Sequence, residues 1–110
     1  MPRIRMPSVI VQRGNDNPTL VLRALRQQLG SVRLCYERAL SRSPQLEGTL
    51  TLLVRFERDG SVSSVEQSAG TLTDAAFVHC VEQALARAKL DAREREPALV
   101  SVAILFAPGN

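Results

Sequence analysis

Two cysteines and one histidine are the residues of this chain best suited to chemistry. Cys35 lies in the amphipathic segment Leu34–Leu40, Cys80 lies in Val78–Leu85, and His79 directly precedes the second cysteine. A Cys–His nucleophile needs the imidazole beside the thiol, but adjacent residues on a helix point about 100° apart. The sequence also lacks a CxxC pair for zinc and a glycine-rich phosphate loop. We therefore predict no catalytic residue, no metal site and no cofactor, so that the protein is not an enzyme.

The cysteine pair has two interpretations. Two helices packed on one face of a small sheet bring thiols to the Cα separation that a disulfide needs. A crosslink between residues 45 positions apart stabilises by roughly 4 kcal/mol in the loop-entropy treatment, and such bonds persist mainly outside the cytosol. The alternative is that Cys35 and Cys80 are two small buried hydrophobic residues.

Length and composition predict one small domain. The chain has 110 residues, 45% of them hydrophobic, and contains no apolar run near the roughly 20 residues of a membrane span. The N-terminal residues do not form a signal-peptide core, so if the domain works outside the cytosol, its export information must lie on a preceding segment. A formal charge of +3 and the absence of tryptophan do not favour a nucleic-acid partner.

Two helices are predicted from apolar residues that recur every three or four positions. The first begins at Pro18 with Asn17 as its N-cap and continues to about residue 40, and Gly30 is a candidate position for a break. The second starts after Thr73, its expected N-cap, and carries an apolar stripe that includes Phe77, Val81 and Leu85.

Three strands are predicted where the apolar period changes to two. The segment Leu50–Phe56 alternates, and Asp59–Gly60 then indicates a hairpin turn with positive φ at both residues. The return strand, Val62 to about Ser68, is polar, and its two valines fall on opposite faces, so either a bulge or a short, irregular strand is expected. A charged loop over Asp91–Glu96 precedes the final alternating strand, Leu99–Phe106.

Together these elements predict an α+β fold of order α-β-β-α-β, with a small antiparallel sheet and two helices packed on one of its faces. Residues 1–17 are predicted to be an N-terminal arm in which Ser8–Gln12 could form a short strand, and residues 18–110 the domain itself. The predicted core consists of Leu25, Leu29, Val32, Leu50, Leu52, Val54, Phe56, Phe77, Val81 and Leu85.

From Gln45 onward, the order of motifs resembles the C-terminal domain of TonB energy-transducing proteins. Leu46–Leu52 is similar to the glycine-led first strand of that family, and Phe56, Asp59–Val62 and Val65 are similar to its hairpin. The upstream and downstream motifs narrow the likeness to the TonB-like C-terminal domain of myxobacterial gliding-motility envelope proteins (AgmX/PglI type). These motifs are Cys35–Glu37, Pro44, Leu46, Gly48, Thr71–Asp74 and Cys80. The likeness covers about residues 20–106, and Ala88–Ala92 departs from the aromatic and proline pair usual at that place.

The resemblance implies a non-catalytic periplasmic adaptor, the C-terminal part of an inner-membrane-anchored protein that takes part in energy transduction and force transmission. In the TonB family a peptide of an outer-membrane-associated partner adds beside the final strand, which is β-augmentation. We therefore predict a Cys35–Cys80 disulfide and a partner-binding edge strand. That strand comprises Leu99, Val100, Ser101, Val102, Ala103, Ile104 and Leu105. Ser8–Gln12 of the arm could pair with the same edge and compete with the partner.

A second functional class depends on the arginines of the first helix, which are Arg23, Arg26, Arg33, Arg38 and Arg42. Such a row is expected as a solvated face whose stems cover apolar surface. It also suits an acidic partner, such as a cell-wall polymer or an anionic membrane surface. The alternative function is therefore a peptidoglycan-binding or purely structural envelope module.

Overall fold

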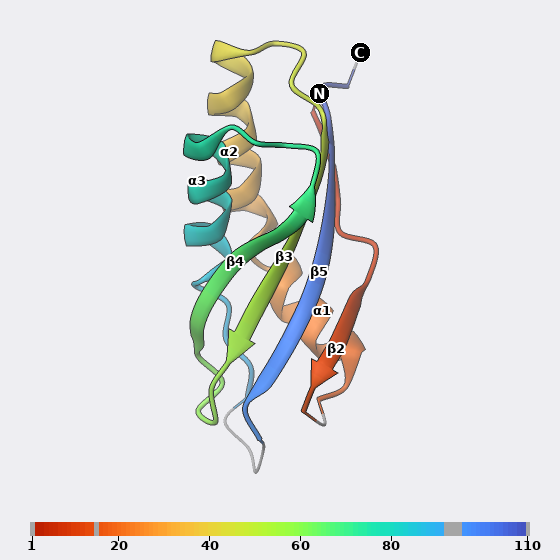
Figure 1. Ribbon diagram of the computed structural model, residues 1–110, viewed down its shortest axis with the longest axis vertical. Coiled ribbons are helices and arrows are strands. Elements are labelled where there is room, and N and C mark those ends of the chain that lie inside the picture. Colours follow the sequence, from red (N-terminus) through yellow and green to blue (C-terminus); the bar gives the residue numbers. More distant parts are fainter. Residues whose placement is uncertain (1, 15, 92–95, 110) are drawn as a thin grey trace.

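A computed structural model describes residues 2–14, 16–91 and 96–109 of the chain. Within these residues, three helices pack on one face of a five-stranded antiparallel sheet (Figure 1). The elements in chain order are β1 (Arg3–Arg5), β2 (Val9–Arg13), α1 (Pro18–Arg26), α2 (Leu29–Arg42), β3 (Gly48–Phe56), β4 (Val62–Gly70), α3 (Ala75–Leu85) and β5 (Ala98–Ala107). The predicted α+β class is confirmed, and the charged loop expected before β5 lies largely outside the described residues.

The sheet contains more strands than the predicted hairpin and final strand, because the arm belongs to it. Its order is β1-β5-β3-β4, and β2 also pairs with β5, on the same side as β1. The short strand that Ser8–Gln12 could form is present as β2, which spans Val9–Arg13. Figure 1 shows β2 as the outermost strand on the side of the sheet opposite β4.

The first predicted helix is two helices. Asn17 caps α1 as expected and accepts a hydrogen bond from the Thr19 backbone N–H at 2.9 Å. The break falls at Gln27–Gln28, ahead of Gly30, which lies in the first turn of α2. In that first turn the backbone N–H groups have no intrahelical partner in any case, so a glycine there need not break the helix.

The start of α3 differs from the prediction by one residue. The N-cap is Asp74 and not Thr73, because the Asp74 carboxylate accepts the Phe77 backbone N–H at 3.0 Å. Arg42 of α2 contacts the same carboxylate at 3.3 Å. Both interactions lower the pKa of Asp74 below its ordinary value, and the hydrogen bond from the Phe77 backbone has the larger effect.

The β3–β4 turn also differs from the expected one. Among the described residues positive φ occurs only at glycines, so Gly60 has φ 88° while Asp59 does not. Hydrogen bonds from Gly60 N–H to the Glu57 carbonyl and from Glu57 N–H to the Ser61 carbonyl define a three-residue loop that ends in a left-handed glycine. The following strand, β4, agrees with the first of the two expected alternatives: it has two register shifts against β3, typical of bulges, and it is nine residues long rather than short.

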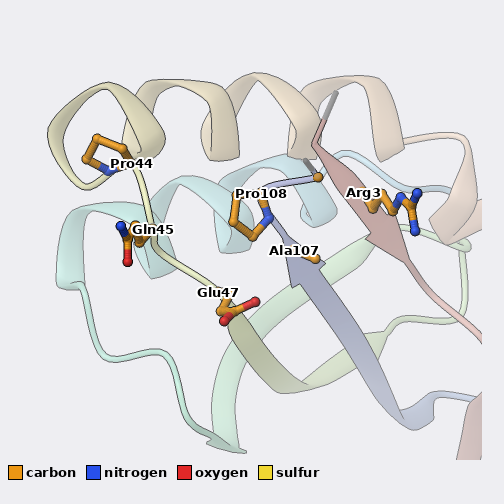
Figure 2. Close-up of a pocket in the computed structure, with 7 residues that line it drawn as sticks. Arg3, Pro44, Gln45, Glu47, Ala107 and Pro108 are labelled. Atoms are coloured by element: carbon orange, nitrogen blue, oxygen red, sulfur yellow. The ribbon is translucent and has the colours of Figure 1, made fainter.

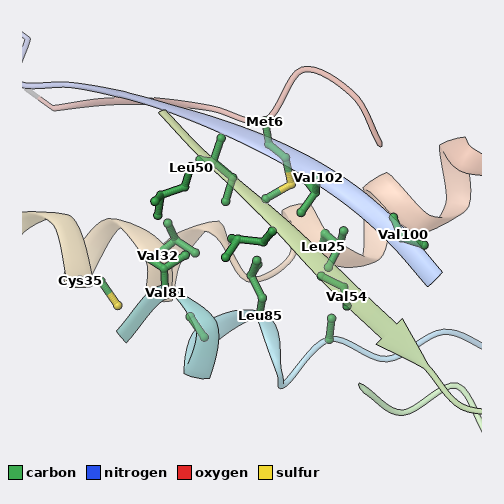
Figure 3. Close-up of a cluster of buried hydrophobic side chains, with 14 of the residues drawn as sticks. Met6, Leu25, Val32, Cys35, Leu50, Val54, Val81, Leu85, Val100 and Val102 are labelled. Carbon is green, nitrogen blue, oxygen red and sulfur yellow. The ribbon is translucent and has the colours of Figure 1, made fainter. Parts of the chain in front are cut away.

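The core lies between the sheet and the helices, as predicted. The inward positions of β3, from Leu50 to Phe56, are fully buried, and so are Leu25, Val32, Val81 and Leu85 (Figure 3). Leu29 is only partly buried. Three aromatic rings, those of Tyr36, Phe77 and Phe106, pack against one another with centroids 5.0–5.7 Å apart.

Truncation of Phe77 to alanine is expected to destabilise the fold by about 3–5 kcal/mol, because it removes a buried ring from this aromatic cluster. Urea denaturation measures the change. Leu34→Ala is the control, since Leu34 is 54% exposed and surface truncations usually stay within about 0.5 kcal/mol. Equal losses in the two variants would contradict this packing.

Replacement of Asp74 by asparagine is expected to lower stability at neutral pH. A lowered folded-state pKa means that the ionised carboxylate stabilises the fold above the unfolded pKa of about 3.9. That contribution is lost as the pH falls through the lower folded-state pKa. The melting temperatures of the unaltered protein and the Asp74→Asn variant should therefore differ at pH 7 and converge in strong acid. Glu37→Gln, at an exposed position of α2, is the control and should not show this pH-dependent difference. A difference that persists unchanged at the lowest pH would refute this.

Candidate functional site: the final strand and the N-terminal arm

The predicted partner-binding strand is fully contained in β5, but β5 is not a sheet edge. On one side it pairs with β3 from Ala98 to Phe106, and on the other it pairs with β1 and β2. The prediction of an exposed edge is therefore wrong for this structure. The physical reason is that an unpaired row of backbone N–H and C=O groups invites pairing, and the arm of the same chain satisfies it.

Alternate residues of β5 face opposite sides of the sheet. Val100, Val102 and Ile104 point into the core and are fully buried. Leu99, Ser101, Ala103 and Leu105 point to the other face, which no described helix covers, and Leu105 is 42% exposed. The backbone of β5 is therefore the part of the predicted site that the arm occupies.

The arm follows β5 along nearly its whole length, with a break between β1 and β2 and a register shift between Val11 and Arg13. Arg3–Arg5 pairs with Leu105–Ala107, and Val9–Val11 pairs with Val100–Val102. Between these two runs, three arm residues, 6–8, lie opposite two residues of β5, so the arm has one extra residue there. Pro7 is one of the three, and its missing N–H cannot support a ladder. The two short strands therefore act as one interrupted strand.

Met6, at this interruption, points into the hydrophobic core. Its side chain is only 2% exposed, and Figure 3 shows it beside Val102. The sequence alone did not predict Met6 as a core residue, because it lies outside any alternating run long enough to indicate a strand. Its two-residue spacing from Ile4, which packs against the core, is the signal that could have found it.

Two arginines hold the backbone of the arm. Arg26 of α1 donates from Nε and from a terminal nitrogen to the Met6 carbonyl, at 3.3 and 2.9 Å. Arg33 of α2 donates to the Pro2 carbonyl at 2.8 Å. With Arg42 bound to Asp74, three of the five helix arginines contact this protein's own groups, so they do not form one free basic face.

The cysteines form a disulfide between α2 and α3. The Cα atoms of Cys35 and Cys80 are 5.7 Å apart, which confirms the predicted pairing. Cys35 is buried and Cys80 is partly exposed, beneath a groove of about 180 Å³ between Arg38 and Arg87. His79 is exposed on the surface of α3, and within the described residues no group of three or more potential ligands could hold a metal ion.

An open pocket of about 490 Å³ lies where the two ends of the chain meet (Figure 2). Its charged residues are Arg3 of β1 and Glu47 before β3, and Figure 2 shows the Arg3 side chain directed away from Glu47. The rest of the lining consists of Pro44, Gln45, Ala107, Pro108 and Gly109. The lining provides no nucleophile paired with a base, so the pocket is not an evident catalytic site.

The pKa of Tyr36 is raised above its ordinary value. Burial is the larger cause, and the negative charge of Glu47 is the smaller one. The Tyr36 hydroxyl donates a hydrogen bond to the Leu46 carbonyl. The phenol therefore stays neutral and ties α2 to the entry of β3, which is a structural role rather than acid–base chemistry.

Comparison with known proteins gives no match: neither a family model nor a curated protein nor a solved structure is similar enough to this chain. In the described ranges, no helix is both long and apolar enough to cross a membrane. The disulfide is compatible with a domain located outside the cytoplasm.

Reduction of the disulfide is expected to destabilise the folded domain by roughly 4 kcal/mol, because it restores the chain entropy of a long loop in the unfolded state. Denaturation with and without reductant measures this. The double variant Cys35→Ser/Cys80→Ser is the control and should be insensitive to reductant. Two freely alkylated thiols in the folded, unreduced protein would contradict the bond.

Proposed function

We propose that this domain is a non-catalytic periplasmic adaptor of a cell-envelope machine and that it transmits force by binding an extended segment of a partner. The proposal includes membership of the TonB-like group that the motifs around Cys35, Gly48 and Asp59–Gly60 resemble. It also includes an inner-membrane anchor on a preceding segment and a partner associated with the outer membrane. The disulfide between two helices supports a location outside the cytoplasm.

The observation that carries the proposal is the pairing of β5 with the arm. A strand of this sheet accepts an extended, interrupted segment that is separated from it by most of the chain. Backbone pairing of this kind is how β-augmentation provides affinity. A partner segment would take the place of the arm beside β5, and the arm would act as a competitor within the same chain.

This mode of binding suits transmission of force. A partner strand that lies antiparallel along β5 is held by several backbone hydrogen bonds at once. The load then passes from β5 to β3 through their long ladder and from the sheet to the helices through the core. The disulfide joins α2 to α3 covalently, so the helical layer resists shear.

A photoreactive residue tests the location of the partner. Placed at Leu105, an exposed leucine of β5, in the variant Met6→Asp, whose buried charge should release the arm, it should form adducts with an outer-membrane-associated protein in an envelope extract. Placed at Leu34, an exposed leucine of α2, it is the matched control and should not. Mass spectrometry should place the crosslinked partner residue in an extended segment. Adducts at position 34 and not at 105, or retention on purified peptidoglycan alone, would favour the wall-binding function instead.

A further inference from the structure

The arm lies beside β5 and is contacted by arginines of α1 and α2, and we call the space that it fills the β5 groove. The arm itself shows which peptide sequence this groove accepts. Its inward side chains are all apolar and recur in two pairs separated by an extra residue, and they are Ile4, Met6, Val9 and Val11. Met6 is the most deeply buried of the four. Neighbouring outward positions carry charged, polar or exposed side chains, such as Arg5 and the 65% exposed Ile10. The groove therefore selects inward side chains by polarity and leaves outward ones free.

The helices recognise the backbone of the arm rather than its outward side chains. Arg26 and Arg33 bind the carbonyls of Met6 and Pro2, two groups four residues apart in the arm. Since every residue has a backbone carbonyl, these contacts fix the register and direction of any strand that follows the same path. Sequence preference then comes from the four inward positions.

Resting on the proposed function, we infer that the partner's docking segment has the pattern of the arm. It is an extended peptide that lies antiparallel to β5 and carries four apolar residues in two pairs. The members of each pair are two positions apart, and three positions separate the second residue of the first pair from the first residue of the second pair. The first pair fills the places of Ile4 and Met6, and the second pair those of Val9 and Val11. An acidic residue is excluded at the buried place of Met6, because a buried, unpaired carboxylate is strongly disfavoured, and it is unfavourable at the three partly buried places.

The probe for this inference is a synthetic peptide of residues 2–13 carrying a fluorophore. In the unaltered chain the arm faces β5 at an effective concentration on the order of millimolar, so it masks the groove. The variant Met6→Asp should release the arm, since position 6 is buried. Ser8→Asp adds the same charge at an exposed position of the arm and is the matched control.

We expect the peptide to bind the Met6→Asp protein at least tenfold more tightly than the Ser8→Asp protein, as measured by fluorescence anisotropy. Amide shifts should fall on residues 99–107. A peptide that itself carries Met6→Asp should not bind, and neither should a scrambled peptide. Loss of Arg26 in the Met6→Asp background should weaken binding, whereas loss of Arg23, which lies on the same helix, should not.

A second pair of variants keeps the test decisive if Met6→Asp does not fold. Val9→Asp places the charge at a half-buried inward position of β2, and Ile10→Asp places it at the neighbouring exposed position. The peptide should bind the first protein at least tenfold more tightly than the second. Equal, weak binding to both would overturn the inference if the spectra show an intact sheet in both proteins and a released arm in Val9→Asp.

The same peptide separates this inference from the function on which it rests. If it blocks partner crosslinking at Leu105 in an arm-released variant, the partner and the arm share one groove and one pattern. If the partner crosslinks there but the peptide neither binds nor competes, the adaptor function stands and the inference fails. If the peptide binds β5 but no partner does, the groove has the inferred preference and the proposed function fails.

Discussion

Two-sided backbone pairing of β5 is the interaction on which the rest of the structure depends. The strand lies between β3 and the arm, and its inward residues from Ala98 to Phe106 are buried. Without the arm, the sheet would end at β5, and one row of its backbone groups would have to be satisfied by water or another chain. The arm therefore completes the sheet, and through Met6 it also completes the core.

The helical layer depends on a different kind of constraint. α2 and α3 cross the same face of the sheet and are joined by the Cys35–Cys80 bond, while the Arg42–Asp74 pair and the Asp74 cap fix the start of α3. The ion pair is at the surface, and such pairs contribute little by themselves. The covalent bond and the aromatic cluster around Phe77 are therefore what hold the two helices in register with the sheet.

The arm connects the structure to the proposed function. Some strand must cover the free side of β5, but the strand that does so need not be the arm. It is held by two short ladders, two arginine–carbonyl contacts and a few apolar side chains, and elements of this size open locally more easily than a whole domain. β5 and β3 share a much longer ladder. A partner segment that repeats the contacts of the arm could exchange with it and leave the remainder of the fold in place.

The sequence by itself determined the elements that local periodicity defines. The inward faces of β3 and β5, the stripes of α2 and α3, and the Asn17 cap follow from apolar spacing and capping chemistry, and the cysteine pairing followed from one thiol on each helix together with a family resemblance. Only the tertiary structure decided that the arm covers β5, that Met6 is a core residue, and that Arg26 and Arg33 bind its backbone. Apolar alternation can predict that each of two distant segments is a strand, but it does not specify which strand each one pairs with, because the hydrogen bonds use backbone groups that every residue carries.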